Sequence, residues 1–296
     1  MAGQIRQIRR RLKSVDKISQ ITRAMELVAT SKIKKAEDRI RATRPYAQKM
    51  VELLQNLTTQ VGLIQHPLLA VHEPMQKTAI LTITSNRGLC GAFNTNVLRR
   101  TEELVKEEQD AGRSVRLMAV GKKGVGYLKY RGYDLMDSYT DISDMPTFED
   151  ARMLAGHLME LYINREVDLV YIVFNHFRTV AEQKPITFKL FPLEHPEREE
   201  GEKTTPKEYL FEPSAELLAQ VLLPAYAETV TYRTMLESAA SEQGARRTAM
   251  KSATDNSTEM ISNLTLKFNR ARQSQITQEL SEITGAVEAL KSARKK

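Results

Sequence analysis

The chain opens with a long stretch that lacks helix breakers and carries a regular apolar repeat. No Gly or Pro occurs between residues 4 and 44. Apolar side chains recur every three or four positions, at Ile5, Ile8, Leu12, Val15, Ile18, Ile21, Met25 and Val28. This spacing predicts a narrow apolar seam on a long α-helix, as in a coiled-coil partner. Pro45 follows, and the leucines at 53, 54 and 57 indicate that the helix resumes beyond it.

The other end of the chain has the same design. From a helix start at residues 212–214, only Pro224, Gly244 and Gly285 interrupt a predicted helix that ends near Leu290. A second apolar seam, in which the spacing also alternates between three and four residues, is formed by Ile276, Leu280, Ile283, Val287 and Leu290. At 1.5 Å per residue the two helices are roughly 80 and 115 Å long, more than an ordinary globular core can cover. We expect them to pack on each other, on partner proteins, or on both.

Charge separates the two ends from the middle. Residues 1–45 hold 13 Lys or Arg against 4 Asp or Glu, and residues 240–296 hold 10 against 6. The intervening residues hold 21 against 27, within a chain of net charge +7. Two basic ends around an acidic centre suggest that the ends form one structural unit that meets an anionic partner.

The segment 238–258 has an unusual composition. Met250 is its one large apolar residue. Small residues recur every four positions, at Ser241, Ala245, Ala249, Ala253 and Ser257. Small side chains let two helix axes approach closely. The pattern fits either a thin, solvent-exposed coiled coil or a slender shaft surrounded by a partner protein.

Between the helical ends, short β-branched apolar runs alternate with amphipathic runs. Strands are expected at 77–84, 114–120, 135–139, 168–177 and 184–193. Helices are expected at 94–108, 122–131 and 148–166. Alternation of this kind predicts a Rossmann-like, mostly parallel sheet, so the fold class is an α/β domain inserted between two long helices.

Several classes of site are excluded by composition and spacing. A single cysteine, Cys90, excludes a disulfide framework and a thiolate metal cluster. The five histidines are scattered, without the spacing of a zinc-binding helix. The longest charge-free run, 53–72, contains Gln and Asn side chains and Pro67, so it is not a membrane span. We expect neither a metal nor a cofactor.

Two glycine turns are the candidates for a phosphate site. Residues 86–94, with Gly88 and Gly91, lack the G-x-G-x-x-G order, and no acidic residue ends the second strand. Residues 121–127 lack the Lys and Ser or Thr that close a P-loop. Tight turns are the simpler interpretation, and a nucleotide-dependent enzyme using Gly88 and Gly91 is one alternative function. Cys90 and His176 are interpreted as packed residues, since no catalytic partner lies near them in sequence.

A second alternative is a basic coiled coil that binds nucleic acid. Tyr46 is the one aromatic residue among the first 60, so stacking of bases is not provided for. A solvated cationic helix face is the simpler interpretation, and we expect no nucleic-acid partner.

Four segments, in order along nearly the whole chain, resemble the signatures of one family. They are SQITRAMELVATSK at 19–32, RGLCGAFN at 87–94, AMKSATDN at 249–256, and FNRARQ with ITQEL at 268–280. Together they closely resemble the gamma subunit of F-type ATP synthases. The fourth departs from the family pattern in lacking a tyrosine.

The resemblance implies a fold and a function. In the family, the N- and C-terminal helices pair antiparallel and pass through a hexamer of alternating alpha and beta subunits. The α/β domain meets the epsilon subunit and the membrane-embedded ring of c subunits. The subunit is a rotor shaft, present once per complex, that couples proton flow through the c ring to ATP synthesis or hydrolysis at the beta-subunit sites. It carries torque and has no active site of its own.

The resemblance also implies contact residues near the C-terminus. By motif position, Arg272, Gln273, Thr277 and Glu279 form a polar contact with a loop of the beta subunit. Each could also be a solvated helix residue. The tip of a coiled coil needs no such polar cluster, which favours a contact for Arg272 and Gln273.

Further residues are carried over by motif position. Arg246 is a second coupling residue, although Arg247 beside it leaves open which of the two pairs with the beta subunit. Met25 corresponds to a residue close to the acidic beta-subunit loop. Tyr209 and Glu212 lie in a short segment that approaches the c ring in the family.

The expected organisation is three segments: a coiled-coil helix at 1–60, the Rossmann-like domain at 76–210, and a coiled-coil helix at 211–296. The loop at 194–207 is rich in Pro and charge, and its contacts are not assigned. The first signature begins without a transit extension, so we expect a peripheral membrane protein on the cytoplasmic face of a bacterial plasma membrane.

Overall fold

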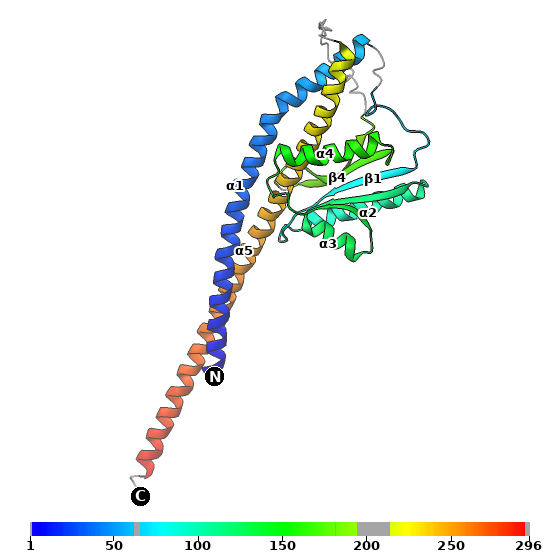
Figure 1. The fold of residues 1–296 in the computed structure, drawn as a ribbon. Coiled ribbons are helices and arrows are strands. Elements are labelled where there is room, and N and C mark those ends of the chain that lie inside the picture. Colours follow the sequence, from blue (N-terminus) through cyan, green and yellow to red (C-terminus); the bar gives the residue numbers. More distant parts are fainter. Residues whose placement is uncertain (1, 62–65, 181, 194–213, 294–296) are drawn as a thin grey trace. The chain divides into compact units, whose positions relative to one another are not determined.

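The computed structural model describes residues 2–61, 66–180, 182–193 and 214–293 (Figure 1). Two long helices frame the chain, α1 (Ala2–Val61) and α5 (Ala215–Ala293). The other elements, in chain order, are β1 (Lys77–Ile83), α2 (Phe93–Asp110), β2 (Ser114–Val120), α3 (Lys122–Tyr130), β3 (Leu135–Tyr139), α4 (Phe148–Ile163), β4 (Leu169–Phe177) and β5 (Gln183–Phe191). Both end helices were expected from the spacing of their apolar residues, and α1 and α5 run through Pro45 and Pro224 without a break.

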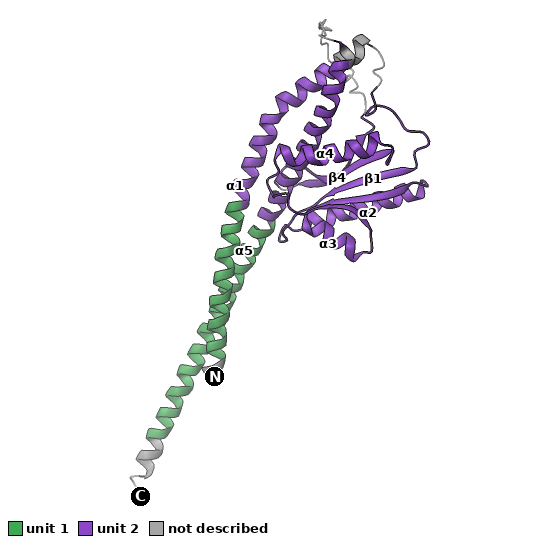
Figure 2. Ribbon diagram, viewed as in Figure 1, with its two compact units in different colours: residues 1–28, 249–296 green, residues 29–248 purple. Residues whose placement is uncertain are grey.

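The chain divides into two compact units (Figure 2). One consists of residues 1–28 and 249–296, and the other of residues 29–248. These units cut across the three segments expected from sequence. The reason is that parts of both end helices contribute side chains to the core of the sheet domain.

The sheet has five strands in the order β3-β2-β1-β4-β5. Strands β1, β2, β3 and β4 are parallel to one another, and β5 pairs antiparallel with β4 at one edge. The predicted mostly parallel, Rossmann-like arrangement is confirmed. A hairpin joins β4 to β5, because an antiparallel partner needs only a short connection whereas a parallel one needs a crossover.

Alternate residues of the central strands enter different cores, so the sheet is covered on both faces. On β1, Ala79, Leu81 and Ile83 belong to a core shared with α4 and with parts of both end helices. Ile80, between them, belongs to a second core under α2 and α3. The end helices contribute Met50, Leu54, Ala219, Leu223 and Ala227 to the first core. The period-two pattern of the strands therefore dictates a three-layer domain.

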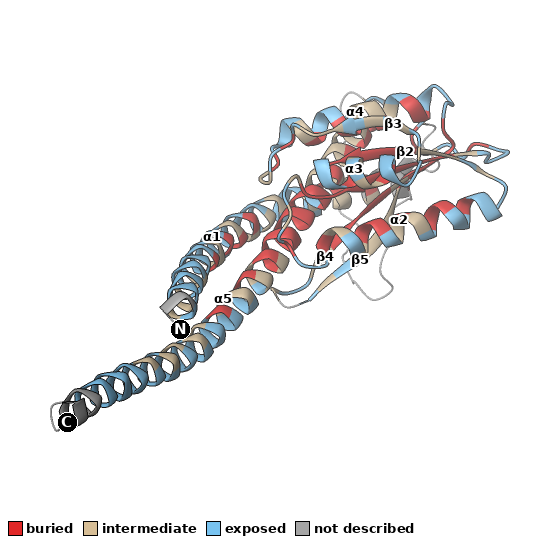
Figure 3. Ribbon diagram, turned by 90° about the horizontal axis from the view of Figure 1, so that it is seen from below, coloured by how far each residue is buried: buried red, intermediate tan, exposed pale blue. Residues whose placement is uncertain are grey.

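The polar segment that begins at 238 was interpreted as either a solvent-exposed coiled coil or a shaft surrounded by a partner protein. The part of α5 at 234–246 fits neither interpretation. Within residues 29–248 it is almost continuously buried, including Glu237, Glu242 and Arg246 (Figure 3). Neither solvent nor a partner protein surrounds it, because its own domain does. Ser241 Oγ donates a hydrogen bond of 2.9 Å to the carbonyl of Asn175 on β4, and Gly244 lies under the β4–β5 turn. Ser241 and Arg246 have hydrogen-bond partners across this junction, which offsets the cost of burying them.

In the other unit, residues 4–28 of α1 pair with the 249–271 part of α5. Thr22 and Thr254 share a hydrogen bond of 2.7 Å between their hydroxyl oxygens, and the Arg9 guanidinium lies 5.5 Å from the centre of the Phe268 ring. Residue numbers that rise along one helix fall along the other, so the pair is antiparallel.

The seam predicted on α1 is correct only in its first half. Ile5, Ile8, Leu12 and Val15 are half-buried as expected. Beyond them the buried line passes to the small residues Ser19 and Thr22, with Met25 half-buried beside it. Three predicted seam residues, Ile18, Ile21 and Val28, are instead 49%, 59% and 55% exposed. Small side chains allow the closer approach of the helices, so they displace the larger ones from the interface.

A buried ion pair at the start of β1 gives a test of the sheet domain. Glu108 of α2 receives a two-pronged contact from Arg113, at 2.6 and 2.9 Å, and a hydrogen bond of 2.6 Å from the Thr78 hydroxyl. Burial alone would raise the pKa of Glu108, but the hydrogen bonds from Arg113 and Thr78 outweigh it and lower the pKa.

We predict that Glu108→Gln lowers the free energy of unfolding at neutral pH by about 1.5–3 kcal/mol, because charge-assisted hydrogen bonds are lost. The folded-state pKa is depressed, so this contribution is complete above the ordinary carboxyl pKa. It disappears as the pH falls through the lowered value. Denaturant unfolding of both proteins from pH 7 to pH 3 measures the difference. Glu103→Gln, on the exposed face of the same helix, is the control and should change stability little. A difference independent of pH would contradict the prediction.

Candidate functional site

Four of the residues implied by the resemblance lie together near the end of α5. The contacts of Thr22 with Thr254 and of Arg9 with Phe268 fix the antiparallel register. By that register the first residues of α1 lie opposite residues 272–275 of α5. Arg272 and Gln273 are therefore at the limit of the helical pair, and Thr277 and Glu279 lie beyond it. Residues 277–287 of α5 are all exposed within the described chain (Figure 3).

These four side chains form two rows on the helix. By helical periodicity, positions 272 and 279 lie on one face, and positions 273 and 277 lie about a third of a turn around the helix from it. All four are exposed, and Glu279 accepts a hydrogen bond of 2.8 Å from Gln275. Among them stand Ile276 and Leu280, about half exposed. The surface combines a cation, an anion, an amide and two apolar side chains on a single rigid element.

Met25 lies far from this group. It is half-buried on α1, and the register places it opposite residue 251 or 252 of α5. That is about 30 Å along the helix from Arg272. The structure thus brings together the four residues at 272–279 and leaves Met25 apart from them.

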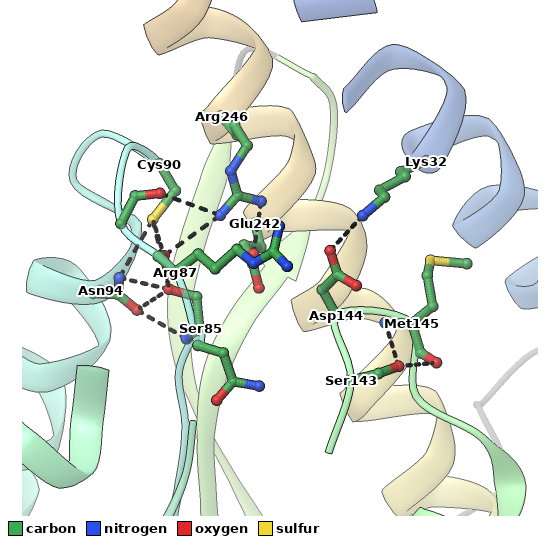
Figure 4. A network of polar contacts seen from close by, with 12 residues as sticks. Lys32, Ser85, Arg87, Cys90, Asn94, Ser143, Asp144, Met145, Glu242 and Arg246 are labelled. Carbon is green, nitrogen blue, oxygen red and sulfur yellow. Dashed lines mark hydrogen bonds and ion pairs between the residues drawn. The ribbon is translucent and has the colours of Figure 1, made fainter. Parts of the chain in front are cut away.

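Arg246 occupies a different environment, within the unit 29–248. It is 7% exposed and its guanidinium binds inside the chain (Figure 4). It pairs with Glu242, one helical turn earlier, at 2.7 Å, and donates to the carbonyls of Arg87 and Gly88, each at 3.4 Å. Its neighbour Arg247 is only half-buried, so Arg247 offers more surface to another protein.

A second ion pair lies close to Arg246. Lys32 of α1 donates to Asp144, in the loop between β3 and α4, at 2.5 Å (Figure 4). Burial alone would raise the pKa of Asp144, but the hydrogen bond from Lys32 lowers it, and the charges of Arg246 and Arg87 act in the same direction. Charged groups from α1, α5 and two loops of the sheet domain therefore converge in one place. The sequence carries no signal for this, since Lys32 and Asp144 are 112 residues apart and Arg246 and Arg87 are 159 apart.

The remaining two predicted residues, Tyr209 and Glu212, lie outside the described residues. The helix that follows them begins where expected. Ser214 caps α5, with its hydroxyl accepting a hydrogen bond of 3.3 Å from the backbone amide of Leu217.

At the glycine turn after β2, the chain's own groups occupy the amides that begin α3. Three consecutive amides at the start of α3 have acceptors from the end of β1: Lys122 N with Asn86 Oδ1 at 3.0 Å, Lys123 N with the Ser85 carbonyl at 3.1 Å, and Gly124 N with Thr84 Oγ1 at 2.9 Å. A phosphate at a helix N-terminus needs such amides free. For residues 121–127 the geometry thus favours the tight-turn interpretation over a phosphate site.

Cys90 and His176 both have structural partners. Cys90 is 2% exposed, with its sulfur 3.3 Å from Asn94 Nδ2, and burial raises the pKa of its thiol. His176 Nδ1 lies 2.5 Å from Glu237 Oε2, which joins β4 to α5. Within the described ranges, His, Cys, Asp and Glu side chains form no cluster of three or more that could hold a metal ion. None of the described helices is long and apolar enough to cross a membrane.

Comparison with known proteins identifies the relatives. The sequence model of the ATP synthase family matches residues 4–290. The ATP synthase gamma chain of Desulfitobacterium hafniense is 43% identical over 285 residues, covering 96% of this chain and 98% of the relative. That of Frankia casuarinae is 42% identical over 297 residues, covering 99% of each.

Solved structures agree in fold. A chain from the central stalk and c-ring structure of Tetrahymena thermophila mitochondrial ATP synthase matches 79% of this chain and 99% of its own length. Its TM-score is 0.59 and its sequence identity 27%. A chain of Euglena gracilis mitochondrial ATP synthase matches 100% of this chain and 97% of its own, with a TM-score of 0.70. At 22% identity the second match concerns the fold alone.

Gly124 and Gly126 of α3 test how closely this helix packs against Thr84, the residue that follows β1. A Cβ atom at Gly124 would lie 2.5 Å from Thr84 Oγ1, whereas one at Gly126 would meet nothing within 4 Å. We predict that Gly124→Ala destabilises the protein by about 1–3 kcal/mol through overpacking. Gly126→Ala, the matched control, should stabilise it by about 0.5–1 kcal/mol because Ala favours the helix. Chemical denaturation measures both. Equal effects of the two substitutions would contradict the close packing.

Proposed function

The chain belongs to the ATP synthase gamma chain family, and on that premise we propose that it is the central-stalk rotor subunit of an F-type ATP synthase. In this role it turns with the c ring and couples proton flow to ATP synthesis or hydrolysis at the beta-subunit sites. Its partners are the alpha and beta subunits, the epsilon subunit and the c ring. The observation that carries the proposal is full-length similarity to gamma chains combined with the antiparallel pairing of the two chain ends.

The physical design of the helical pair supports this role. A shaft has to be stiff and slim, and its surface must not hold one angular position too strongly. Thr22 meets Thr254 hydroxyl to hydroxyl, so the helices pack through small side chains. Many of the exposed positions on both helices in this unit are polar, although apolar side chains such as Ile18, Ile21 and Ile283 are exposed as well. The polar part of the surface limits the apolar area that could fix the shaft to a surrounding sleeve.

Charge supports the proposed partners. The chain ends are basic, with 13 Lys or Arg in residues 1–45 and 10 in residues 240–296. Complementary charge directs association and fixes its orientation more than it adds affinity. Acidic loops of the beta subunits are the partners that such a surface fits. Because the shaft has to act on several beta sites in turn, its contacts must differ between beta-subunit conformations.

The polar contact itself is proposed at residues 272–279. Arg272 and Gln273 would meet a beta-subunit loop, with Thr277 and Glu279 completing the contact, since these four side chains are exposed at and beyond the limit of the helical pair. Met25 would be a separate contact point on α1, and Tyr209 with Glu212 would approach the c ring. Catalysis would belong to the beta subunits, so this chain needs no active site, metal or cofactor. The complex would lie on the cytoplasmic face of a bacterial plasma membrane, with this chain as a peripheral, single-copy component.

Purification with native partners tests the proposal directly. A tagged copy of this chain, expressed in its own cell and isolated in mild detergent, should recover alpha, beta, epsilon and c subunits together with ATPase activity. Recovery of the chain alone, or with unrelated proteins, would overturn the assignment. Micromolar binding of ATP or NAD by the isolated chain, measured by calorimetry, would favour the nucleotide-enzyme alternative instead.

We predict that Arg272→Ala combined with Gln273→Ala lowers coupled ATP synthesis in membrane vesicles by about fivefold or more, as expected when a coupling free energy of ordinary size is lost. Assembly should survive, because both side chains are exposed and their loss removes no core contact. Gln278→Ala is a suitable control, since Gln278 lies on the same stretch and bonds Glu282 of its own helix. Synthesis unchanged by the double substitution would count against this contact.

A further inference from the structure

The guanidinium of Arg246 is buried and makes three hydrogen-bonding contacts. The Glu242 carboxylate lies one helical turn away, and the other two acceptors are carbonyls of consecutive residues, Arg87 and Gly88. Figure 4 shows Arg246 reaching from α5 toward the loop that carries these carbonyls and Cys90. The planar fork of a guanidinium suits this arrangement, because it can donate to several acceptors held in fixed positions. A lysine at this position would be a single point charge.

The loop that Arg246 holds, residues 86–91, is conformationally demanding. Leu89 has a φ of 65°, in the left-handed region that large side chains rarely adopt, and its side chain is 65% exposed. Gly91 has a φ of 56°. A non-glycine residue in this region persists only when its surroundings restrain it. Asn94 restrains one side of the loop through bonds to Ser85 and Cys90, and the Ser85 hydroxyl donates to the Arg87 carbonyl at 2.7 Å. The side that faces α5 is restrained by Arg246.

Glu242 completes the restraint by holding Arg246 in place. Its carboxylate is buried, and burial raises its pKa while the neighbouring Arg246 opposes the shift. A buried charge without a partner is strongly unfavourable, so each member of the pair fixes the other. The loop is thereby tied to α5 through a side chain that has almost no surface left for another protein.

We propose that Arg246 is a positioning residue of the rotor, which together with Glu242 clamps the loop 86–91 to α5 and so keeps the sheet domain rigidly attached to this helix. This role rests on the proposed rotor function. It differs from a direct contact between Arg246 and a beta subunit, because Arg246 acts on coupling through the loop. Torque that passes between the sheet domain and α5 requires a stiff joint, and the clamp contributes that stiffness.

The single cysteine of the chain reports on the clamp. Cys90 lies within the loop and is buried, so its thiol reacts only when the loop opens. In the purified full-length chain, we expect Arg246→Ala and Glu242→Gln each to speed the reaction of Cys90 with a maleimide by about tenfold or more. Circular dichroism would show that the fold is retained. Arg233→Ala removes another arginine that pairs with a glutamate at the same spacing on α5 and serves as the matched control, with an unchanged rate.

Coupled ATP synthesis in the assembled complex separates positioning from direct contact. If Arg246 acts as a clamp, Glu242→Gln should lower ATP synthesis as Arg246→Ala does. The double variant should synthesise ATP no more slowly than Arg246→Ala alone. Arg246→Lys should fail to restore synthesis. A direct contact with an acidic beta loop predicts the opposite set: no effect of Glu242→Gln and substantial rescue by Arg246→Lys.

The outcomes distinguish this inference from the proposed function. Unchanged Cys90 reactivity in both variants would overturn the clamp, whatever the partners of the chain are. Faster labelling with unchanged synthesis would overturn its part in coupling. Should Arg246→Ala fail to fold, Glu242→Gln and Arg246→Lys carry the same comparison with smaller perturbations. Failure to purify the chain with its expected subunits would overturn the rotor function, whereas the labelling experiment would still decide whether the clamp exists.

Discussion

A buried charged side chain needs a partner of opposite charge within the fold, and this requirement determines how the centre of α5 packs. The helix changes its environment along its length without a break. Ala219, Leu223 and Ala227 enter the apolar core of the sheet domain, where the hydrophobic effect is sufficient. The next turns are polar and buried, and in them Glu237 pairs with Arg233 and Glu242 with Arg246. The polar segment therefore specifies which loops of the domain can lie against the helix.

The two units show different solutions to the problem of packing a long helix. Within residues 29–248, α1 and α5 bury apolar side chains against a sheet, and this gives a conventional core. Within residues 1–28 and 249–296, the helices meet through Thr22, Thr254 and other narrow contacts, which leave most side chains in solvent. The first solution provides a firm attachment and the second a slim rod. A rotor subunit needs both, and one chain supplies them by changing the composition along the same two helices.

The regular parts of this fold are predictable from sequence because their periodicity is local. Each strand and helix of the sheet domain was expected within a few residues of its observed limits, since alternation and amphipathic spacing are properties of neighbouring residues. The seam on α1 was less predictable. Ile18, Ile21 and Val28 continue the apolar spacing, but they are exposed. Ser19 and Thr22 lie nearer the interface because their small side chains allow the two helices to approach closely. Family signatures indicated the residues at 272–279 as contacts, which stays a prediction. They could not indicate the clamp at Arg246, because Arg87 and Gly88 meet it only in the folded chain.

The apolar row that α1 leaves open has a consequence for the newly made polypeptide. Ile18, Ile21 and Val28 face water, as do Ile276, Leu280 and Ile283 near the end of α5. Rows of this kind promote self-association when a protein is free at appreciable concentration. A cell that makes this chain in excess of its neighbours therefore risks aggregates, so matched rates of subunit synthesis protect the pool of unassembled chains as much as they supply the finished machine.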